Sequence, residues 1–279
     1  MTRAVLGSTT SGAGRAARDV SQSRAPEHGG AVATGLRRLA QTRIGRRVAG
    51  SVRGVETAEP VFGVTFDDGP HPVVTPAVLD LLDSRHASAT FFMRAGRALA
   101  HPDLARAVAA RGHEVGVHGF DHLRMTELGP RGFGRETASA RRALHRIVGG
   151  AAPDWFRPPY GAQNVRTFLA TRAQGMRVAV WAADVDDATR TDGMSIVPGP
   201  GAGLTLRVPG RRMPLSPGHI LLLHDTPAAE DGPDGAARKI ALIERILDGI
   251  DAAGGRVVTL TELLEYGPPD RRVWRSAGY

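Results

Sequence analysis

The chain has 279 residues, a formal net charge of +8 and no Cys, so it can fold as one α/β domain but cannot form disulfides or thiolate metal sites. Of its 36 basic and 28 acidic residues, ten Arg but only Asp19 and Glu27 lie in residues 1–55, which leaves 26 of each sign in the rest. The positive charge therefore belongs to the first segment, and we expect no nucleic-acid partner. Lys239 is the only Lys in a chain that otherwise uses Arg.

Residues 1–55 are rich in Arg, Ala, Gly and Ser and have almost no periodic apolar pattern, which is typical of a disordered arm. The chain contains neither the apolar core of a secretory signal nor a stretch of about 20 apolar residues that could span a membrane. We therefore expect a cytoplasmic protein, with an organelle transit peptide or a misassigned start as the alternatives. Residues 56–266 are expected to form the folded domain, and 267–279 a C-terminal tail.

Strand and helix patterns alternate from about residue 60 onward, which predicts a parallel sheet or barrel. Thr75 and Thr261 are predicted to cap the first and the last helix. Residues 188–217 break the rhythm with many Gly and Pro, and a loop of that length is usually functional or disordered; only 204–208 in it resembles a strand. The predicted strands are 61–66, 89–93, 113–118, 155–157, 177–181, 220–223 and 257–260, and the predicted helices are 75–86, 102–112, 131–148, 165–174, 236–253 and 261–266.

Chemically active side chains follow most of the predicted strands. In an α/β barrel the carboxyl ends of the strands meet at one end, where active sites are built. A scatter of structural polar residues would have no reason to prefer that end. The residues in question are Asp67 and Asp68 after the first strand, His118 and His122 at the third, Arg157 at the fourth, Asp184 after the fifth and His224 after the sixth.

The adjacent carboxylates of Asp67 and Asp68 predict a metal site. Two acids side by side repel each other, so a site that keeps both usually neutralises one with a cation and leaves the other to take a proton. His118 and His122 can reach one ion if the segment between them makes a single turn. Two imidazoles and one carboxylate suit Zn²⁺ and also Co, Mn or Fe. Without the acid pair, the two His would be interpreted as ordinary surface or core residues.

Five motifs together resemble those of the polysaccharide deacetylase family, the NodB-like proteins of carbohydrate esterase family 4. They are TFDDGP at 65–70, HGFDH at 118–122, FRPPYG at 156–161, the spacing of Trp181, Asp184 and Asp187, and LLLHD at 221–225. The resemblance covers residues 60–265 in the family's order and implies that 56–266 is the catalytic domain. It also implies a distorted (β/α)₇ barrel, in agreement with the strands predicted above.

The resemblance implies a hydrolase that removes an N-acetyl group from an amino sugar in a polysaccharide, glycolipid or smaller glycoside. The reaction would proceed by attack of metal-bound water, with Asp67 as the general base. Asp68, His118 and His122 would bind the metal, for which Zn²⁺ is expected and Co²⁺ or Mn²⁺ are alternatives.

Further roles follow from the same resemblance. His224 would protonate the departing amine, Asp184 would orient its imidazole, and Arg157 would pair with Asp67. The backbone N–H of Tyr160 would help the metal to stabilise the oxyanion. The substrate pocket would be lined by Pro159, Trp181 and Leu222.

Two positions depart from the family pattern, and two other readings stay open. Gly119 stands where the family usually has Ser or Thr, and Ala188 stands where it usually has a Trp that walls the acceptor pocket. Asp187 is interpreted as a loop-capping residue. One alternative function is hydrolysis of a cyclic amide or ureide, against which the His118 and His122 pair argues. The other is a non-catalytic carbohydrate-binding relative whose basic arm holds an anionic partner. The oligomeric state is left open.

Overall fold

The computed structural model describes residues 50–199 and 203–272. The expected disordered arm lies outside these residues, apart from its last few positions. No helix in the described ranges combines the length and the apolar character needed to cross a membrane.

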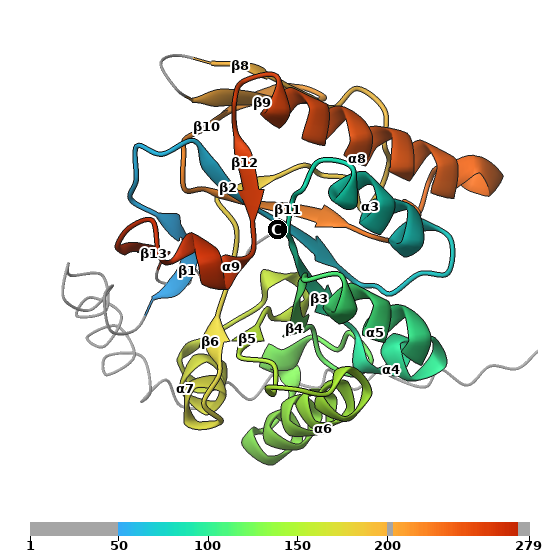
Figure 1. Ribbon diagram of the computed structural model, residues 1–279. Helices are drawn as coiled ribbons and strands as arrows, with labels where there is room; N and C mark the ends of the chain where they lie inside the picture. Colours follow the sequence, from blue (N-terminus) through green and yellow to red (C-terminus); the bar gives the residue numbers. More distant parts are fainter. Residues whose placement is uncertain (1–49, 200–202, 273–279) are drawn as a thin grey trace, which may run out of the picture. The chain divides into compact units, whose positions relative to one another are not determined.

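A curled parallel sheet forms the centre of the fold, with strand order β6-β5-β4-β3-β2-β11-β7 (Figure 1). The eighth strand, β12, pairs with the first half of β2, and β3 pairs with its second half. The predicted α/β fold is confirmed, and each predicted strand coincides with an observed one. Their bounds are β2 Val61–Asp67, β3 Thr90–Met93, β4 Glu114–Val117, β5 Trp155–Phe156, β6 Arg177–Val178, β7 Ala183–Asp184, β11 Ile220–His224 and β12 Arg256–Val258.

The barrel is distorted where the predicted strand 177–181 leaves the sheet. β6 stands at one end of the strand order and β7 at the other. Between them, Val180 N donates to Val52 O (2.8 Å) and Ala182 N donates to Ile220 O (2.9 Å). One short segment therefore links the two ends of the sheet without a continuous ladder.

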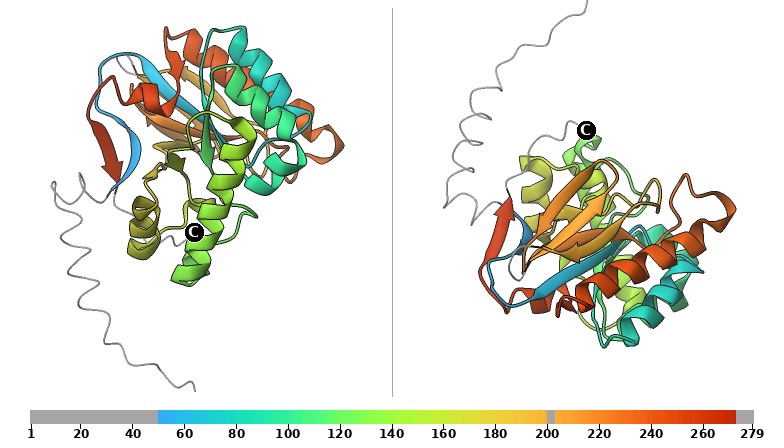
Figure 2. Two further views of the ribbon diagram at one scale, coloured as in Figure 1. Left: turned by 60° about the horizontal axis from the view of Figure 1, so that its bottom comes forward. Right: turned by 90° about the horizontal axis from the view of Figure 1, so that it is seen from above.

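Helices cover the outer face of the curled sheet (Figures 1 and 2). The predicted helices are confirmed, and α4 was not predicted. The sheet and helices bury an apolar core in which Phe66 and Phe91 stack with ring centroids 5.0 Å apart. The helices are α3 Val74–Asp83, α4 Ala95–Ala100, α5 Pro102–Ala110, α6 Pro130–Val148, α7 Val165–Ala173, α8 Gly235–Asp251 and α9 Leu260–Leu263, with 3₁₀ turns η1 Met125–Glu127, η2 Pro159–Gly161 and η3 Gly232–Asp234.

Both predicted helix caps were wrong. The start of α3 is bound by His71, whose Nδ1 accepts the N–H groups of residues 73 and 74, while the Thr75 hydroxyl donates to Asp225 Oδ2 (2.5 Å). The last helix is capped two residues earlier than predicted, because Thr259 and Glu262 form a reciprocal capping box.

The folded region extends beyond both predicted domain boundaries. β1 Ser51–Val55 pairs antiparallel with β13 Pro269–Arg272, and Arg53 Nε lies 2.7 Å from Asp270 Oδ2. Residues 51–55 are therefore not part of a disordered arm, and 269–272 are not a free tail. Each segment is short, and only its pairing with a distant partner makes it a strand.

Residues 188–217 contain a second sheet where a loop was predicted. β8 Ser195–Pro198, β9 Leu204–Val208 and β10 Arg211–Leu215 form an antiparallel sheet of order β10-β9-β8. Figure 2 shows these strands in orange beside α8, and a Cβ at Gly249 of α8 would lie only 2.8 Å from Ile196 O. The strand-like pattern at 204–208 is confirmed, since β9 has those bounds, but the expected loop on either side of it was wrong, because alternating apolar residues pack this sheet onto α8.

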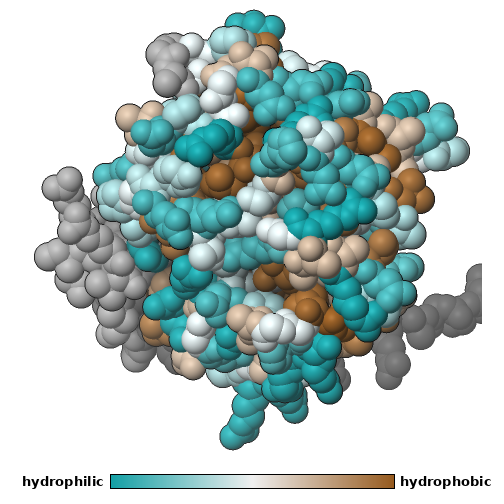
Figure 3. Space-filling view, viewed as in Figure 1, coloured by the Kyte–Doolittle hydropathy of each residue, from teal (hydrophilic) through white to brown (hydrophobic). Residues whose placement is uncertain are grey.

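Hydrophobic side chains are distributed in small groups on the face shown in Figure 3. Teal, hydrophilic side chains separate them, as on ordinary solvent-facing protein surfaces.

Candidate active site

The strands bring most of the predicted residues to one end of the sheet. Asp67 ends β2, His224 ends β11, and the two residues are paired in register. His118 follows β4, and Arg157 follows the neighbouring β5. Because parallel strands point the same way, these side chains share the carboxyl end of the sheet, as predicted.

Asp68, His118 and His122 form a group that can hold a divalent cation. One potential ligand atom from each lies within 4.8 Å of the other two. Asp68 Oδ1 is 3.3 Å from His122 Nε2 and 3.9 Å from His118 Nε2, and it is buried without a hydrogen-bond partner. A buried carboxylate oxygen facing two imidazole nitrogens is an incomplete polar site that a cation would complete.

The second nitrogen of His118 is already used. Its Nδ1 donates to the carbonyl oxygen of Arg157 (2.8 Å), so its Nε2 is left as the lone-pair nitrogen facing Asp68. Burial lowers the pKa of His122 to about 4, which keeps that imidazole neutral at ordinary pH. Burial alone would raise the pKa of Asp68, but His118, His122 and other neighbours outweigh it and the pKa is lowered. The donor set thus fits a divalent metal.

Three residues at this site have left-handed backbone conformations that non-Gly residues seldom adopt. The φ angles are 76° for Asp68 and 60° for His122 and Tyr160. Such conformations cost about 1–3 kcal/mol each and persist only where the surroundings impose them. Here they turn the side chains of consecutive loops toward one another.

Gly119 is required by the same loop. Its φ is 79°, and a Cβ there would approach Met125 Cε to 2.8 Å. The hydroxyl expected from other family members is missing, but Glu136 of α6 supplies an acceptor: its Oε1 binds the N–H of Phe120 at 2.7 Å. A carboxylate from a neighbouring helix therefore orders the loop between the two His ligands.

Asp67 is held by a buried ion pair, as expected. Arg157 Nη1 donates to Asp67 Oδ1 (2.7 Å) and to Thr65 Oγ1 (2.7 Å), and its guanidinium lies 4.1 Å from the ring centroid of Phe92. The other oxygen, Asp67 Oδ2, is 3.6 Å from His118 Nε2. Arg157 therefore fixes one oxygen of the carboxylate and leaves the second facing the metal group.

The predicted partner of His224 was wrong. Asp187, and not Asp184, lies against the imidazole, with 2.7 Å between His224 Nδ1 and Asp187 Oδ1. Asp187 Oδ2 also accepts the backbone N–H of His224 (3.0 Å). Asp184 instead accepts the N–H of Asp186 (2.8 Å). Asp186 has φ 65°, and this left-handed turn brings Asp187 back toward β11. Asp187 is consequently no loop cap.

This pairing changes the charge state of the imidazole. Burial alone would lower the pKa of His224, but the Asp187 carboxylate outweighs it and raises the pKa to about 9. Burial would likewise raise the pKa of Asp187, but Lys239 and His224 lower it to about 2. At neutral pH the pair is an imidazolium and a carboxylate.

Lys239 was not predicted to belong to the site. It is fully buried on α8, and its Nζ lies 2.7 Å from Asp187 Oδ2. The sequence feature that could have drawn attention to this residue is that it is the only Lys of the chain and lies in a predicted amphipathic helix.

The residues predicted to contact substrate lie around these groups. Tyr160 is 46% exposed as a residue, with its ring centroid 4.4 Å from that of His122 and 4.7 Å from the Arg124 guanidinium. Leu222 is buried in β11 beside Asp184, in register with it. Pro159 is buried, and Trp181 is partly buried with its ring close to Gly161.

Ala188 offers no aromatic wall for an acceptor pocket. Its carbonyl oxygen instead accepts the N–H of Ala229 (3.1 Å), and Thr189 O accepts the N–H of Glu230 (2.8 Å). The segment after Asp187 is therefore joined to the loop that follows β11.

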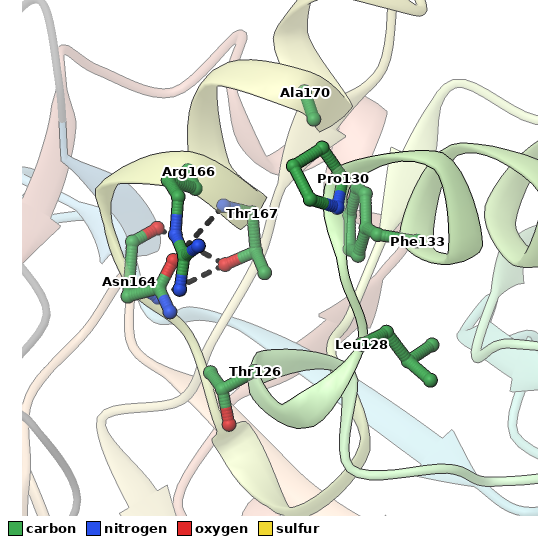
Figure 4. A pocket seen from close by; sticks show the side chains of 8 residues that line it. All are labelled: Thr126, Leu128, Pro130, Phe133, Asn164, Arg166, Thr167 and Ala170. Atoms are coloured by element: carbon green, nitrogen blue, oxygen red, sulfur yellow. Dashed lines mark hydrogen bonds between the residues drawn. The ribbon is translucent and has the colours of Figure 1, made fainter.

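A separate small pocket lies between α6 and α7 (Figure 4). Leu128, Pro130 and Phe133 line one side, and Thr167 and Ala170 of α7 line the other. Its volume of about 30 Å³ admits only a few water molecules, and none of the residues that line it was predicted to belong to the active site. It is not the substrate site.

Known proteins resemble this chain over most of its described length. The sequence model of the polysaccharide deacetylase family matches residues 54–179. A peptidoglycan-N-acetylglucosamine deacetylase of Bacillus cereus is 31% identical over 212 residues, which cover 76% of this chain and 92% of that protein. A chitooligosaccharide deacetylase of Azorhizobium caulinodans is 31% identical over 198 residues, which cover 68% of this chain and 88% of that protein.

The fold is also shared with a solved protein that is not an active enzyme. A carbohydrate esterase family 4 pseudoenzyme from Bacillus anthracis matches with a TM-score of 0.63 at 18% identity, over 80% of this chain and 72% of that one. Such a likeness shows the fold alone, so activity is argued from side chains and from the closer relatives. The two deacetylases are matched over most of their length. This chain therefore belongs to the polysaccharide deacetylase family, carbohydrate esterase family 4, whose reaction is the hydrolysis of carbon–nitrogen bonds other than peptide bonds.

Proposed function

We propose that the protein removes the acetyl group from an N-acetylglucosamine unit of a glycan with the help of a divalent cation. The observation that carries this proposal is the meeting of three groups at one end of the sheet. These are the cation ligands, the Asp67 ion pair with Arg157, and the His224 pair with Asp187. The names of the relatives from Bacillus cereus and Azorhizobium caulinodans support the choice of an acetylated glucosamine.

Asp68, His118 and His122 would hold the cation, with Zn²⁺ as the first candidate and Co²⁺ or Mn²⁺ as alternatives. When bound, such a cation polarises water and the amide carbonyl. Asp67 would accept the proton of the attacking water through Oδ2, the oxygen that Arg157 leaves free. Arg157 would keep that carboxylate ionised and oriented.

His224 would give its proton to the departing nitrogen. An amine is a poor leaving group, so C–N cleavage needs an acid at the nitrogen while the base acts at the water. With a pKa of about 9, His224 would enter the reaction protonated, and the Asp187 carboxylate would compensate its charge. The backbone N–H of Tyr160 is proposed as a donor to the oxyanion.

Acetate release tests this proposal. The protein should be assayed on N-acetylglucosamine oligomers from chitin and from peptidoglycan, before and after chelation and after metal is added back. We expect acetate release that chelator abolishes and metal restores. Release of a ring-opened product from a cyclic amide or ureide, without acetate, would favour the alternative hydrolase. Glycan binding without any turnover would favour a non-catalytic relative.

A further inference from the structure

The only Lys of the chain lies at a fully buried position behind His224. Lys239 Nζ donates to Asp187 Oδ2 (2.7 Å) and also bonds the main-chain carbonyl oxygen of Asp187. An ammonium group carries three donors on a flexible stem, whereas a guanidinium is a wide planar fork. Placing Lys rather than Arg at this one position suits a point charge directed at a single carboxylate and its own carbonyl.

Asp187 is held from two sides by these contacts. Its Oδ1 meets His224 Nδ1, and its Oδ2 meets both Lys239 Nζ and the backbone N–H of His224. Asp187 and Lys239 have no exposed side-chain surface, and His224 is 14% exposed. Lys239 contacts Asp187, and Asp187 contacts His224, so the three side chains connect the buried face of α8 with the active site.

The total charge of these three side chains changes during the proposed reaction. Before proton transfer, the imidazolium of His224 and the ammonium of Lys239 share one carboxylate. Once His224 has given its proton to the amine, the buried carboxylate would face a neutral imidazole. A buried carboxylate without a cation is costly, so a lone Asp187 would hold the proton on His224 more tightly. Lys239 supplies the compensating charge that remains after the proton has left.

We propose that Lys239 is a positioning residue that keeps Asp187 ionised and directed at His224 in both proton states of the imidazole. This inference rests on the proposed function for its catalytic consequence. It assigns to Lys239 an action through Asp187, without contact with substrate or metal.

Kinetics of two variants test the charge. Lys239→Met keeps the length of the side chain and removes its charge, and Lys239→Gln keeps a hydrogen-bond donor without charge. Both should lower kcat by about 10- to 100-fold, part of the 10²- to 10⁴-fold that general acid catalysis contributes, and should leave KM within about twofold. The matched control is Leu242→Ala, also buried on α8 and outside the site. It should lower the melting temperature while kcat stays within about twofold. Retention of kcat in both Lys239 variants would overturn the proposal.

Nuclear magnetic resonance of the wild-type holoenzyme tests the coupling without a Lys variant that has to fold. Because the chain has one Lys, labelling with ¹⁵Nζ-lysine gives one side-chain ammonium signal. We expect this signal to shift with the same midpoint as the imidazole signals of His224, and to lose that shift in His224→Gln. A Lys239 signal that stays fixed while His224 titrates would overturn the proposal. Absence of acetate release by the wild type would instead refute the proposed function, and the resonance experiment would still decide the coupling.

Discussion

The carboxylate of Asp187 makes two hydrogen bonds with His224, one to the imidazole Nδ1 at 2.7 Å and one to the backbone N–H at 3.0 Å. The two contacts use different oxygens, so they fix the carboxylate plane and the imidazole relative to the end of β11. The relationship therefore identifies which acid of the Trp181 motif serves the site, and it can be tested directly.

Asp187→Asn should lower kcat much more than Asp184→Asn. The first change removes the charge that supports the imidazolium, and we expect a loss of about 10²-fold or more, within the range of general acid catalysis. Asp184 accepts the N–H of Asp186 and makes no hydrogen bond to His224, so its variant should retain more than a tenth of the activity. Steady-state kinetics of the two variants side by side provide the measurement. A larger loss in Asp184→Asn would support Asp184 as the partner of His224, and equal losses would contradict the choice of Asp187 over Asp184.

The pH profile of kcat/KM, which reports the ionising groups of the free enzyme, should have its basic limb near pH 9. His224 has a raised pKa of about 9 and must be protonated to act as the acid, so the rate should fall as the pH rises through that value. In Asp187→Asn the burial of the imidazole is no longer opposed by that charge. Its basic limb should therefore move to lower pH, which a profile from pH 5 to about 10 can detect. An unchanged limb would assign it to another group.

The adjacent acids of β2 should respond differently to loss of charge. Asp68→Asn should weaken metal binding, because a neutral amide is a poorer ligand for a divalent cation. Asp67→Asn should retain the metal and lose about 10²- to 10⁴-fold in kcat, because it removes the proposed base. Metal content by elemental analysis, together with kcat, distinguishes them. Metal loss from Asp67→Asn with retention by Asp68→Asn would reverse the two roles.

Arg157→Met should destabilise the fold strongly. It leaves the Asp67 carboxylate buried without its cation, and breaking a buried pair in this way typically costs about 3–5 kcal/mol. The double variant Arg157→Met with Asp67→Asn removes both charges and should recover part of that loss. Urea unfolding of the wild type, the two single variants and the double variant measures their free energies of unfolding. If the double variant lost as much stability as the two single variants together, or more, the ion pair would not be the source of the loss.

Two deletions at the N-terminus should distinguish the contribution of residues 1–48 from that of β1. Removing residues 1–48 leaves β1 intact, so kcat and the melting temperature should stay close to those of the full chain. Removing residues 1–55 takes away the partner of β13 and the Arg53 ion pair with Asp270, and should lower the melting temperature by several degrees. Loss of turnover in the shorter deletion would show that the arm contributes to the site.

The sequence alone determined the strands of the central sheet and most of its covering helices, the family and most of the site. Those features are local: apolar periodicity places a strand, and a polar residue at its end is then carried to the active end of the sheet. Asp67, Asp68, His118 and His122 could be predicted for this reason, because each lies at a strand end or one turn beyond it.

Only the tertiary structure decided what depends on pairing between distant segments. β1 and β13 are strands because they meet each other, and β8 to β10 form a sheet because α8 covers their apolar face. The choice of Asp187 over Asp184 depends on the left-handed turn at Asp186, and the role of Lys239 depends on how α8 lies behind β11. The spacing of residues in the sequence does not give the direction of these side chains. The backbone conformation of one residue, Asp186, decides which of the two acids faces the imidazole.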